Sequence, residues 1–138
     1  MKKQNIKRFI PQREPILMVD QLVSVNDCIA ECCFTIQETN FFLNEKGQMA
    51  EPGIIEHIAQ SASAFAGYKS FLNGATEPPI GYIGEIKNFH CYRCPQIGEE
   101  LKTTITFGTE LNGITILSGE TRISNELIAD TRMKIFLK

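Results

Sequence analysis

The sequence lacks a strong excess of charge of either sign and any long apolar run. Its 14 Lys and Arg residues nearly balance its 16 Asp and Glu residues, for a formal net charge of −2. Phosphate binding requires a concentrated basic face, so this balance gives no reason to expect a nucleic-acid partner. No apolar stretch is long enough to span a bilayer, and the N-terminus has neither the apolar run nor the cleavage site of a secretory signal. We therefore expect neither a nucleic acid nor a membrane as partner.

The sequence also lacks the even cysteine count of a disulfide framework. Its five cysteines favour a reducing, cytoplasmic compartment. Cys91 and Cys94 have CxxC spacing, but residues three apart in an extended strand point to opposite faces, which disfavours zinc binding or redox chemistry. We expect no metal and no cofactor.

The length of 138 residues suits one domain, 1–138. Residues 1–14 are expected to form a short lead-in. Its basic side chains are expected to be solvated rather than a binding patch, namely those of Lys2, Lys3, Lys7 and Arg8.

Apolar segments bounded by turn signals predict six strands. Segments 16–25 and 28–36 are separated by Asn26-Asp27 and predict a hairpin. Four more strands are predicted in the ranges 80–94, 99–111, 114–123 and 127–137. Asn112-Gly113 is a strong hairpin signal because both turn positions need positive φ. In the last segment apolar and polar residues alternate, which indicates a sheet with one buried and one wet face.

One long helix is predicted over 54–72, after Pro52-Gly53 and before Asn73-Gly74. It is apolar nearly all round, so it belongs inside a core. The order is two strands, one buried helix and four strands in a meander. A sheet of about six strands can bury a helix fully only by curling around it, which is the α+β hot-dog arrangement. An ordinary α+β sandwich is the alternative, but it would leave the helix one wet side.

Glu56, Gln60 and Ser63 interrupt the apolar helix at i, i+4 and i+7, so they form one stripe. A buried carboxylate must be paired, hydrogen-bonded or protonated, and such a group suits proton transfer. Glu56 is therefore a candidate general acid or base, with Gln60 orienting it or the substrate. Alternatively, Glu56 stabilises the helix through its position near the N-terminus. The spacing alone does not distinguish these interpretations.

Three neighbouring features are weaker candidates. Free N–H groups near Gly53 could polarise a thioester carbonyl, although the sequence alone favours a glycine that simply permits a strand-to-helix corner. His57 adjoins Glu56 and is a candidate catalytic residue. One step along a helix turns the side chain by about 100°, however, which favours a packed or interface histidine. His90 lies in a predicted strand and can face either way.

Three segments resemble the (3R)-hydroxyacyl-acyl-carrier-protein dehydratases, in the same order. Residues 10–20, IPQREPILMVD, resemble their LPHRxPxLLVD opening. Residues 52–61, PGIIEHIAQS, resemble their PGxxxxEAxAQ helix start, with two residues fewer between Gly and Glu. Residues 86–99 resemble their KxxFxxPVxPGD strand and turn. With Asn44, Gly47 and Glu51 before the helix, the pattern is more similar still to the dehydratase-like hot-dog proteins of aryl-polyene and flexirubin pigment clusters.

In that family a GHFPG histidine takes the C2 proton, the helix glutamate assists loss of the C3 hydroxyl as water, and two subunits share each site. The resemblance implies an acyl thioester substrate on acyl carrier protein or coenzyme A, and a homodimer or higher homo-oligomer. It implies Glu56 as the acid, Gln60 as its helix neighbour and Gly53 as an amide near the thioester carbonyl. The further candidate substrate-binding residues are Gln12, Asn44 and Ser63.

This sequence departs from the family at both histidine positions. No GHFPG segment is present, because the aligned stretch 41–47 reads FFLNEKG. Gln12 replaces the histidine of the LPH opening, and glutamine cannot take a proton at neutral pH. Either His57 or His90 supplies the base, for instance across a dimer, or the chemistry differs, or catalysis is lost.

Three functions follow. The first is a 3-hydroxyacyl-thioester dehydratase, a lyase of fatty acid or polyene biosynthesis that uses Glu56. The second is a thioesterase in which Glu56 activates water. The third is a non-catalytic acyl-binding subunit. The missing histidines favour the other two functions, but the three segments that match the family in order place the dehydratase first.

Overall fold

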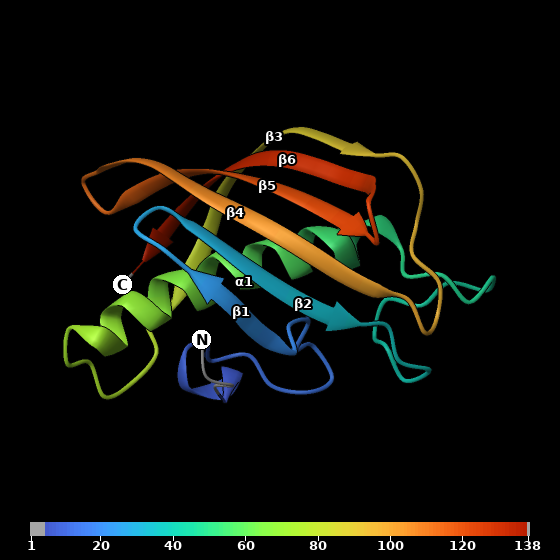
Figure 1. Cartoon of the computed structure of the whole chain (residues 1–138), viewed down its shortest axis with the longest axis horizontal. Helices are drawn as coiled ribbons and strands as arrows, with labels where there is room; N and C mark the ends of the chain where they lie inside the picture. The colour runs from blue at the N-terminus through green and yellow to red at the C-terminus, as the bar shows by residue number, and fades with distance from the viewer. Residues whose placement is uncertain (1–4, 138) are drawn as a thin grey trace.

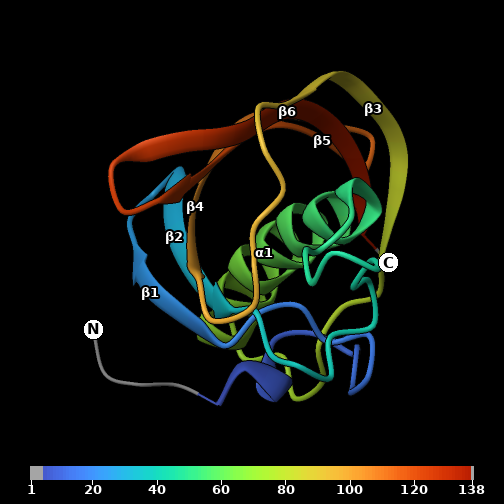
Figure 2. The same ribbon diagram turned by 90° about the vertical axis from the view of Figure 1, so that its right-hand side faces the viewer.

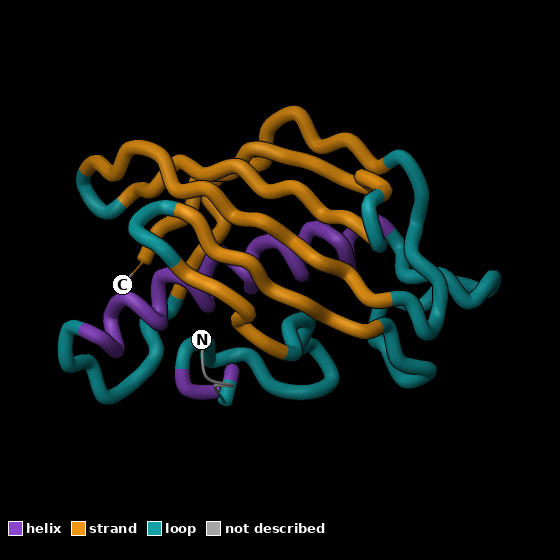
Figure 3. Tube along the Cα trace, in the orientation of Figure 1, coloured by secondary structure: helices purple, strands orange, loops and turns teal. Residues whose placement is uncertain are grey.

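The computed structural model describes residues 5–137 and shows a six-stranded antiparallel sheet curled around one helix (Figures 1 and 2). The predicted hot-dog fold is therefore confirmed. Figure 3 shows the strands as one continuous layer with the helix on a single side. The elements are β1 Gln21–Val25, β2 Ile29–Thr35, α1 Glu51–Leu72, β3 Gly81–Cys91, β4 Glu100–Leu111, β5 Ile114–Ile123 and β6 Glu126–Leu137, after a short 3₁₀ turn at Ile6–Arg8.

The turn signals fall where the structure turns. Asn112 and Gly113 have φ of 54° and 79° between β4 and β5, as the hairpin requires. Asn26 closes the β1–β2 hairpin by accepting hydrogen bonds from the amides of Cys28 and Ile29. The helix begins at Glu51, three residues before the predicted start, because proline at position 52 is tolerated within a first helical turn.

The strand order differs from the predicted meander. Within residues 5–137 the order is β1-β2-β4-β5-β6-β3, so of the four strands after α1 only β4, β5 and β6 form a meander. β4 pairs with β2 in the middle of the sheet, and β3 pairs with β6 at the far edge. The prediction was wrong because α1 carries the chain across the open side of the curled sheet before β3 begins. β3 is consequently an edge strand.

The core lies between α1 and the concave face of the sheet. The middle of α1, from Gly53 to Gly67, is buried except for the half-buried pair Ile55 and Glu56. Thr131, Met133 and Ile135 of β6 alternate toward this core, as predicted. Leu72, at the C-terminal end of the helix, is 64% exposed, so the helix emerges from the sheet there. In the part of the chain that is described, no helix has the length and hydropathy needed to cross a membrane.

The segment before β1 is packed against the helix through its apolar side chains, whereas Arg8 is exposed, as expected of the basic residues. Phe9 and Ile10 are fully buried, and the Arg8 guanidinium lies 5.7 Å from the ring centroid of Phe71. Gly67 permits this contact, since a Cβ there would lie 2.0 Å from the Phe9 carbonyl oxygen. In Figure 2 the lead-in, in dark blue, lies below α1 on its side away from the sheet. Lys2 and Lys3 lie outside the described residues.

The first predicted strand begins too early. Residues 16–20 are not a strand, and β1 starts at Gln21. The backbone of Met18 instead bonds to side chains of α1, which supply the polar partners that a ladder would otherwise provide.

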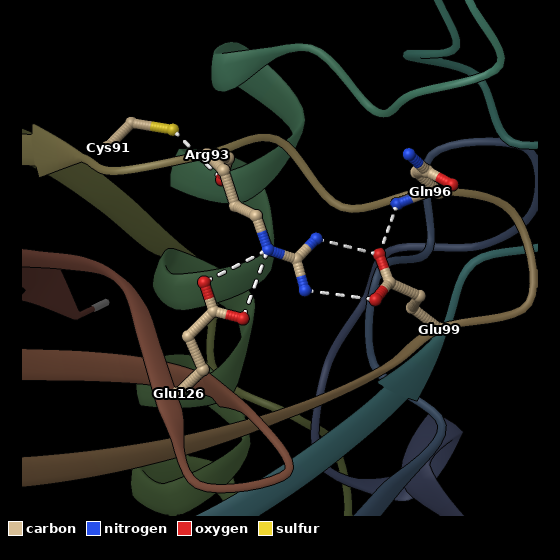
Figure 4. A network of polar contacts seen from close by, with 5 residues as sticks. All are labelled: Cys91, Arg93, Gln96, Glu99 and Glu126. Atoms are coloured by element: carbon tan, nitrogen blue, oxygen red, sulfur yellow. Dashed lines mark hydrogen bonds and ion pairs between the residues drawn. The ribbon is translucent and has the colours of Figure 1, made fainter.

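Arg93 organises the loop between β3 and β4 (Figure 4). Its guanidinium makes a bidentate ion pair with Glu99, at 2.9 and 3.0 Å, and reaches Glu126 at the β5–β6 turn. The same loop accepts a hydrogen bond of 2.8 Å from the Met49 amide through the Pro95 carbonyl. Arg93, Glu99 and Glu126 form the Arg93 cluster. This cluster connects the turn of the last hairpin to the residues that lead into α1.

Candidate active site

A cavity of about 210 Å³ lies between α1, the lead-in and the edge of the sheet at β3 and β6. Both polar and apolar groups line it, and one of them is a carboxylate. The lining residues are Gln12 of the lead-in, Glu56, Ala59, Gln60 and Ser63 of α1, Gly81, Tyr82 and Ile83 of β3, and Ile135 of β6.

Glu56 and Gln60 lie one helical turn apart and are hydrogen-bonded. The Gln60 side-chain nitrogen donates to a Glu56 carboxylate oxygen at 2.7 Å and to the Ile16 carbonyl at 2.8 Å. The Gln60 side-chain oxygen accepts from the Met18 amide at 2.6 Å. Both N–H donors of the Gln60 amide are thus occupied, so Gln60 holds Glu56 and offers no further donor to a ligand.

His57 points away from this cavity, into the core. Its Nδ1 donates to the Met18 carbonyl at 2.6 Å, because a carbonyl can only accept. Its Nε2 then accepts from the Thr103 hydroxyl at 2.7 Å, and Thr103 in turn is 2.7 Å from the Thr121 hydroxyl. His57 and Gln60 together therefore bind both the carbonyl and the amide of Met18, which attaches the segment before β1 to the helix.

Burial disfavours a charge on His57. The side chain is fully buried and stacks on Phe34 with ring centroids 5.8 Å apart. Desolvation lowers the pKa of His57 to about 4, although the hydrogen bond to the Met18 carbonyl acts in the opposite direction. The imidazole is neutral at physiological pH, and both of its nitrogens are engaged.

Three other predicted site residues lie outside the cavity wall. His90 is on the outer face of β3, where its Nδ1 lies 2.9 Å from the Asp130 carboxylate. The Gly53 amide donates to the Ala50 carbonyl at 2.9 Å, and a Cβ at Gly53 would lie 2.6 Å from the Met49 side chain. Asn44 closes a surface turn, since its side-chain oxygen accepts from the amides of residues 46 and 48. Close packing is the local reason for glycine at position 53.

Gln12 and Ser63 do line the cavity with Glu56 and Gln60. The Gln12 side-chain oxygen is buried and has no hydrogen-bond partner within residues 5–137. Buried polar atoms are almost always paired, so this acceptor requires a partner such as an ordered water or a ligand. Ser63 lies two turns along the helix from Glu56 and is 7% exposed.

Sequence reasoning missed the wall formed by the edge of the sheet. Tyr82 and Ile83 line the cavity from β3, and Ile135 lines it from β6. A signal was present in β3, where apolar residues occur on both faces of one strand. Ile80, Ile83 and Ile86 are 49%, 40% and 40% exposed. Such exposure on an edge strand next to a cavity is typical of a surface that another chain covers.

Cys91 and Cys94 were expected to lie in one extended strand, but the structure does not place them so. β3 ends at Cys91, so Cys94 lies in the following loop. Both are free thiols, and burial together with the neighbouring Cys94 raises the pKa of Cys91 to about 11. Over residues 5–137 no group of three His, Cys, Asp or Glu side chains is arranged to hold a metal ion.

Comparison with known proteins finds dehydratases among the family models, the curated relatives and the solved structures. Residues 4–138 match the model of the ApeP-like family, described as ApeP dehydratase. A 3-hydroxyacyl-acyl-carrier-protein dehydratase, FabZ of Shewanella woodyi, is 27% identical over 133 residues, which cover 93% of this chain and 86% of the relative. A solved dehydratase heterocomplex, ApeI:P of Xenorhabdus doucetiae, matches with a TM-score of 0.89 and 18% identity over 96% of this chain and 90% of that chain.

A more distant structure shares the fold. The smu.793 protein of Streptococcus mutans, solved with acetyl CoA bound, matches with a TM-score of 0.65 and 11% identity. The match covers 85% of this chain and 86% of that chain.

Proposed function

Since this chain belongs to the ApeP-like dehydratase family, and is thus a dehydratase-like lyase for 3-hydroxyacyl thioesters, we propose that Glu56 transfers the protons of that reaction. One observation carries the assignment. Glu56 is the one carboxyl group among the residues that line the cavity, and Gln60 holds it there. The two histidines of the chain are engaged elsewhere, His57 in the core and His90 on the outer face of β3.

A single carboxylate can complete the elimination. An ionised Glu56 oxygen takes the C2 proton, which is acidified by the thioester carbonyl. The electrons of the C2–H bond form the C2=C3 double bond as the C3–O bond breaks. The protonated Glu56 then transfers that proton to the departing oxygen, which leaves as water, and Glu56 is ionised again. The role of Gln60 is to hold the carboxylate in one orientation between the two carbons.

We also propose that a second chain completes the site across β3. The cavity wall is an edge strand, and the exposed Ile83 and Ile86 of β3, with Ile80 just before it, supply an apolar surface beside the cavity. An edge strand presents hydrogen-bonding groups that another strand can pair with. The likeness in fold to the subunits of a dehydratase heterocomplex supports pairing between hot-dog domains.

The second chain is a copy of this one or a different hot-dog subunit. A copy would not bring His57 to the cavity, because that side chain is buried in its own core. If the elimination uses a histidine base, that base is either His90 of a second copy, which lies exposed on β3, or a histidine of a different subunit. Mass measurement of the purified complex, with and without co-expressed hot-dog proteins, distinguishes the two assemblies.

The thioester carrier and the compartment also belong to the proposal. Acyl carrier protein is favoured by the family relatives, and coenzyme A carries the same pantetheine thioester. A cytoplasmic location stays a prediction from the odd number of cysteines.

The decisive experiment supplies the protein with a 3-hydroxyacyl thioester and a saturated acyl thioester. Enoyl thioester formation from the first supports the dehydratase. Release of free thiol from the second would indicate a thioesterase instead, and binding without turnover would indicate an acyl-binding subunit. Glu56→Gln should abolish water loss, whereas Glu38→Gln, at an exposed position away from the cavity, should not. Water loss retained in Glu56→Gln would remove Glu56 from the mechanism.

A further inference from the structure

We propose that Gln12 recognises the C3 hydroxyl of the substrate by accepting a hydrogen bond from it, which makes Gln12 the residue that distinguishes 3-hydroxyacyl groups from their saturated counterparts. This inference rests on the proposed function. Its basis is the side-chain oxygen of Gln12. In the described part of the chain, this is the one buried side-chain oxygen or nitrogen that has no hydrogen-bond partner. That oxygen belongs to a residue on the wall of the cavity that contains Glu56.

The lead-in holds Gln12 in this position. The guanidinium of Arg13 donates to the carbonyls of Ile10 and Gln12, both at 2.8 Å, and to the carbonyl of Lys7 at 3.2 Å. These three hydrogen bonds hold the backbone of residues 7–13 around the side chain of Arg13. Ile10 is fully buried beneath them, so the backbone of Gln12 is anchored from both sides. Gln12 is therefore held at the cavity wall by an ordered segment.

The Gln12 and Glu56 oxygens favour a ligand that carries a hydrogen-bond donor. Both N–H groups of the Gln60 amide are occupied, and one Glu56 oxygen accepts from it. The Gln12 oxygen and the second Glu56 oxygen are acceptors only, whereas Ser63 and Tyr82, which also line the cavity, carry hydroxyls that can donate or accept. A saturated or unsaturated acyl chain carries no donor, whereas a 3-hydroxyl carries one. An unpaired buried acceptor disfavours ligands that cannot satisfy it.

This assignment also suits the departure of water. If the hydroxyl donates its hydrogen to Gln12, its oxygen lone pairs are free to face Glu56. The protonated carboxyl can then donate to that oxygen as the C3–O bond breaks. The leaving water keeps its own hydrogen toward Gln12 and gains the second from Glu56, so each hydrogen is accounted for.

The test measures binding where turnover does not interfere. In Glu56→Gln protein, in the oligomer that it forms, titration calorimetry compares (3R)-3-hydroxybutyryl-CoA with butyryl-CoA. The hydroxyl compound is expected to bind about five- to tenfold more tightly, as one neutral hydrogen bond allows. Adding Gln12→Met, which keeps the length of the side chain and removes its polar atoms, should reduce this ratio toward one. Adding Gln37→Met, at an exposed position, should leave it unchanged.

A second ligand tests the direction of the hydrogen bond without altering Gln12. 3-Fluorobutyryl-CoA places an atom of similar size at C3 that cannot donate. It should bind as butyryl-CoA does. Equal binding of the hydroxyl and fluoro compounds would overturn the proposal, and so would a hydroxyl preference that survives Gln12→Met. Either result would indicate that a water alone satisfies the Gln12 oxygen.

A different measurement, turnover by the wild-type protein, tests the proposed function. If wild-type protein converts no 3-hydroxyacyl thioester to the enoyl product, the dehydratase assignment of this chain is lost whatever the binding ratio. If turnover occurs but the hydroxyl preference does not depend on Gln12, only the role of Gln12 is lost.

Discussion

The side-chain nitrogen of Gln60 lies 2.7 Å from a carboxylate oxygen of Glu56, one helical turn away on α1. The Gln60 amide cannot turn to another partner, because the carbonyl of Ile16 and the amide of Met18 occupy its remaining groups. Glu56 is therefore oriented by a side chain that is itself held by the segment before β1. The backbone of residues 16–18 therefore positions Gln60, and Gln60 in turn positions Glu56 in the cavity.

Gln60→Met should impair turnover more than substrate binding. Loss of the amide frees Glu56 to adopt other rotamers, and misplacement of a reacting group costs on the order of 10- to 100-fold in kcat. KM should change little, because Gln60 offers no free donor to a ligand. Steady-state kinetics with a 3-hydroxyacyl thioester measure both constants.

The same substitution removes partners from two buried backbone groups, at a cost of about 1–3 kcal/mol in the free energy of unfolding. Urea unfolding measures this loss, and Gln37→Met serves as the exposed control. An unchanged kcat in folded Gln60→Met protein would contradict the positioning role.

His57 should make the protein less stable in mild acid. Its folded pKa of about 4 lies below the ordinary value of 6.5, so the unfolded chain binds the proton first as the pH falls. The stabilising contribution is complete above pH 6.5 and decreases between pH 6.5 and pH 4, by up to about 3 kcal/mol. Urea unfolding across this range measures it.

His57→Gln supplies the comparison for that pH dependence. The variant cannot gain this proton, so the difference in unfolding free energy between wild type and variant should shrink as the pH falls from 7 toward 4. A difference that stays constant with pH would show that His57 does not titrate as its burial requires.

The Arg93 cluster should contribute stability at neutral pH that is lost in acid. The ion pair with Arg93 lowers the pKa of Glu99, so its stabilising effect is present above the unfolded pKa near 4.5 and disappears as the pH falls through the lower folded value. Arg93→Met should reduce the free energy of unfolding by about 1 kcal/mol at pH 7, since the pair is partly exposed.

The effect of Arg93→Met should become smaller as the pH falls through the lowered pKa of Glu99, because the protonated carboxyl no longer forms the ion pair. Arg122→Met is a matched control, since Arg122 pairs with Glu120 on the outer surface, where both side chains are about half exposed. Equal effects of the two substitutions at pH 7 would show that the Arg93 cluster has no special role.

Gly67→Ala should separate the lead-in from the helix. The added Cβ would lie 2.0 Å from the Phe9 carbonyl oxygen, so one of the two backbones must move. Overpacking of this kind costs about 1–3 kcal/mol or more. Because residues 7–13 carry Gln12, the displaced lead-in should also weaken the preference for 3-hydroxyacyl thioesters. Thermal unfolding and the binding ratio measure the two effects, and a stability equal to that of wild type would contradict the close approach.

Local sequence patterns accounted for most elements of the fold. The all-round apolar character of α1 required a sheet that curls, and Asn112-Gly113 required a hairpin, because each depends on neighbouring residues alone. The stripe of Glu56, Gln60 and Ser63 follows in the same way from helical periodicity, and these three residues do line one cavity.

Long-range contacts decided the rest. The pairing of β3 with β6 made β3 an edge strand, and no local pattern specifies a partner so far along the chain. The core hydrogen bonds of His57 to Met18 and Thr103, and the return of Gln12 to the cavity, likewise join segments that are distant in sequence. Periodicity states which side chains share a face of one element. Which element covers that face, and which polar atoms then meet, depends on the packing of the whole chain.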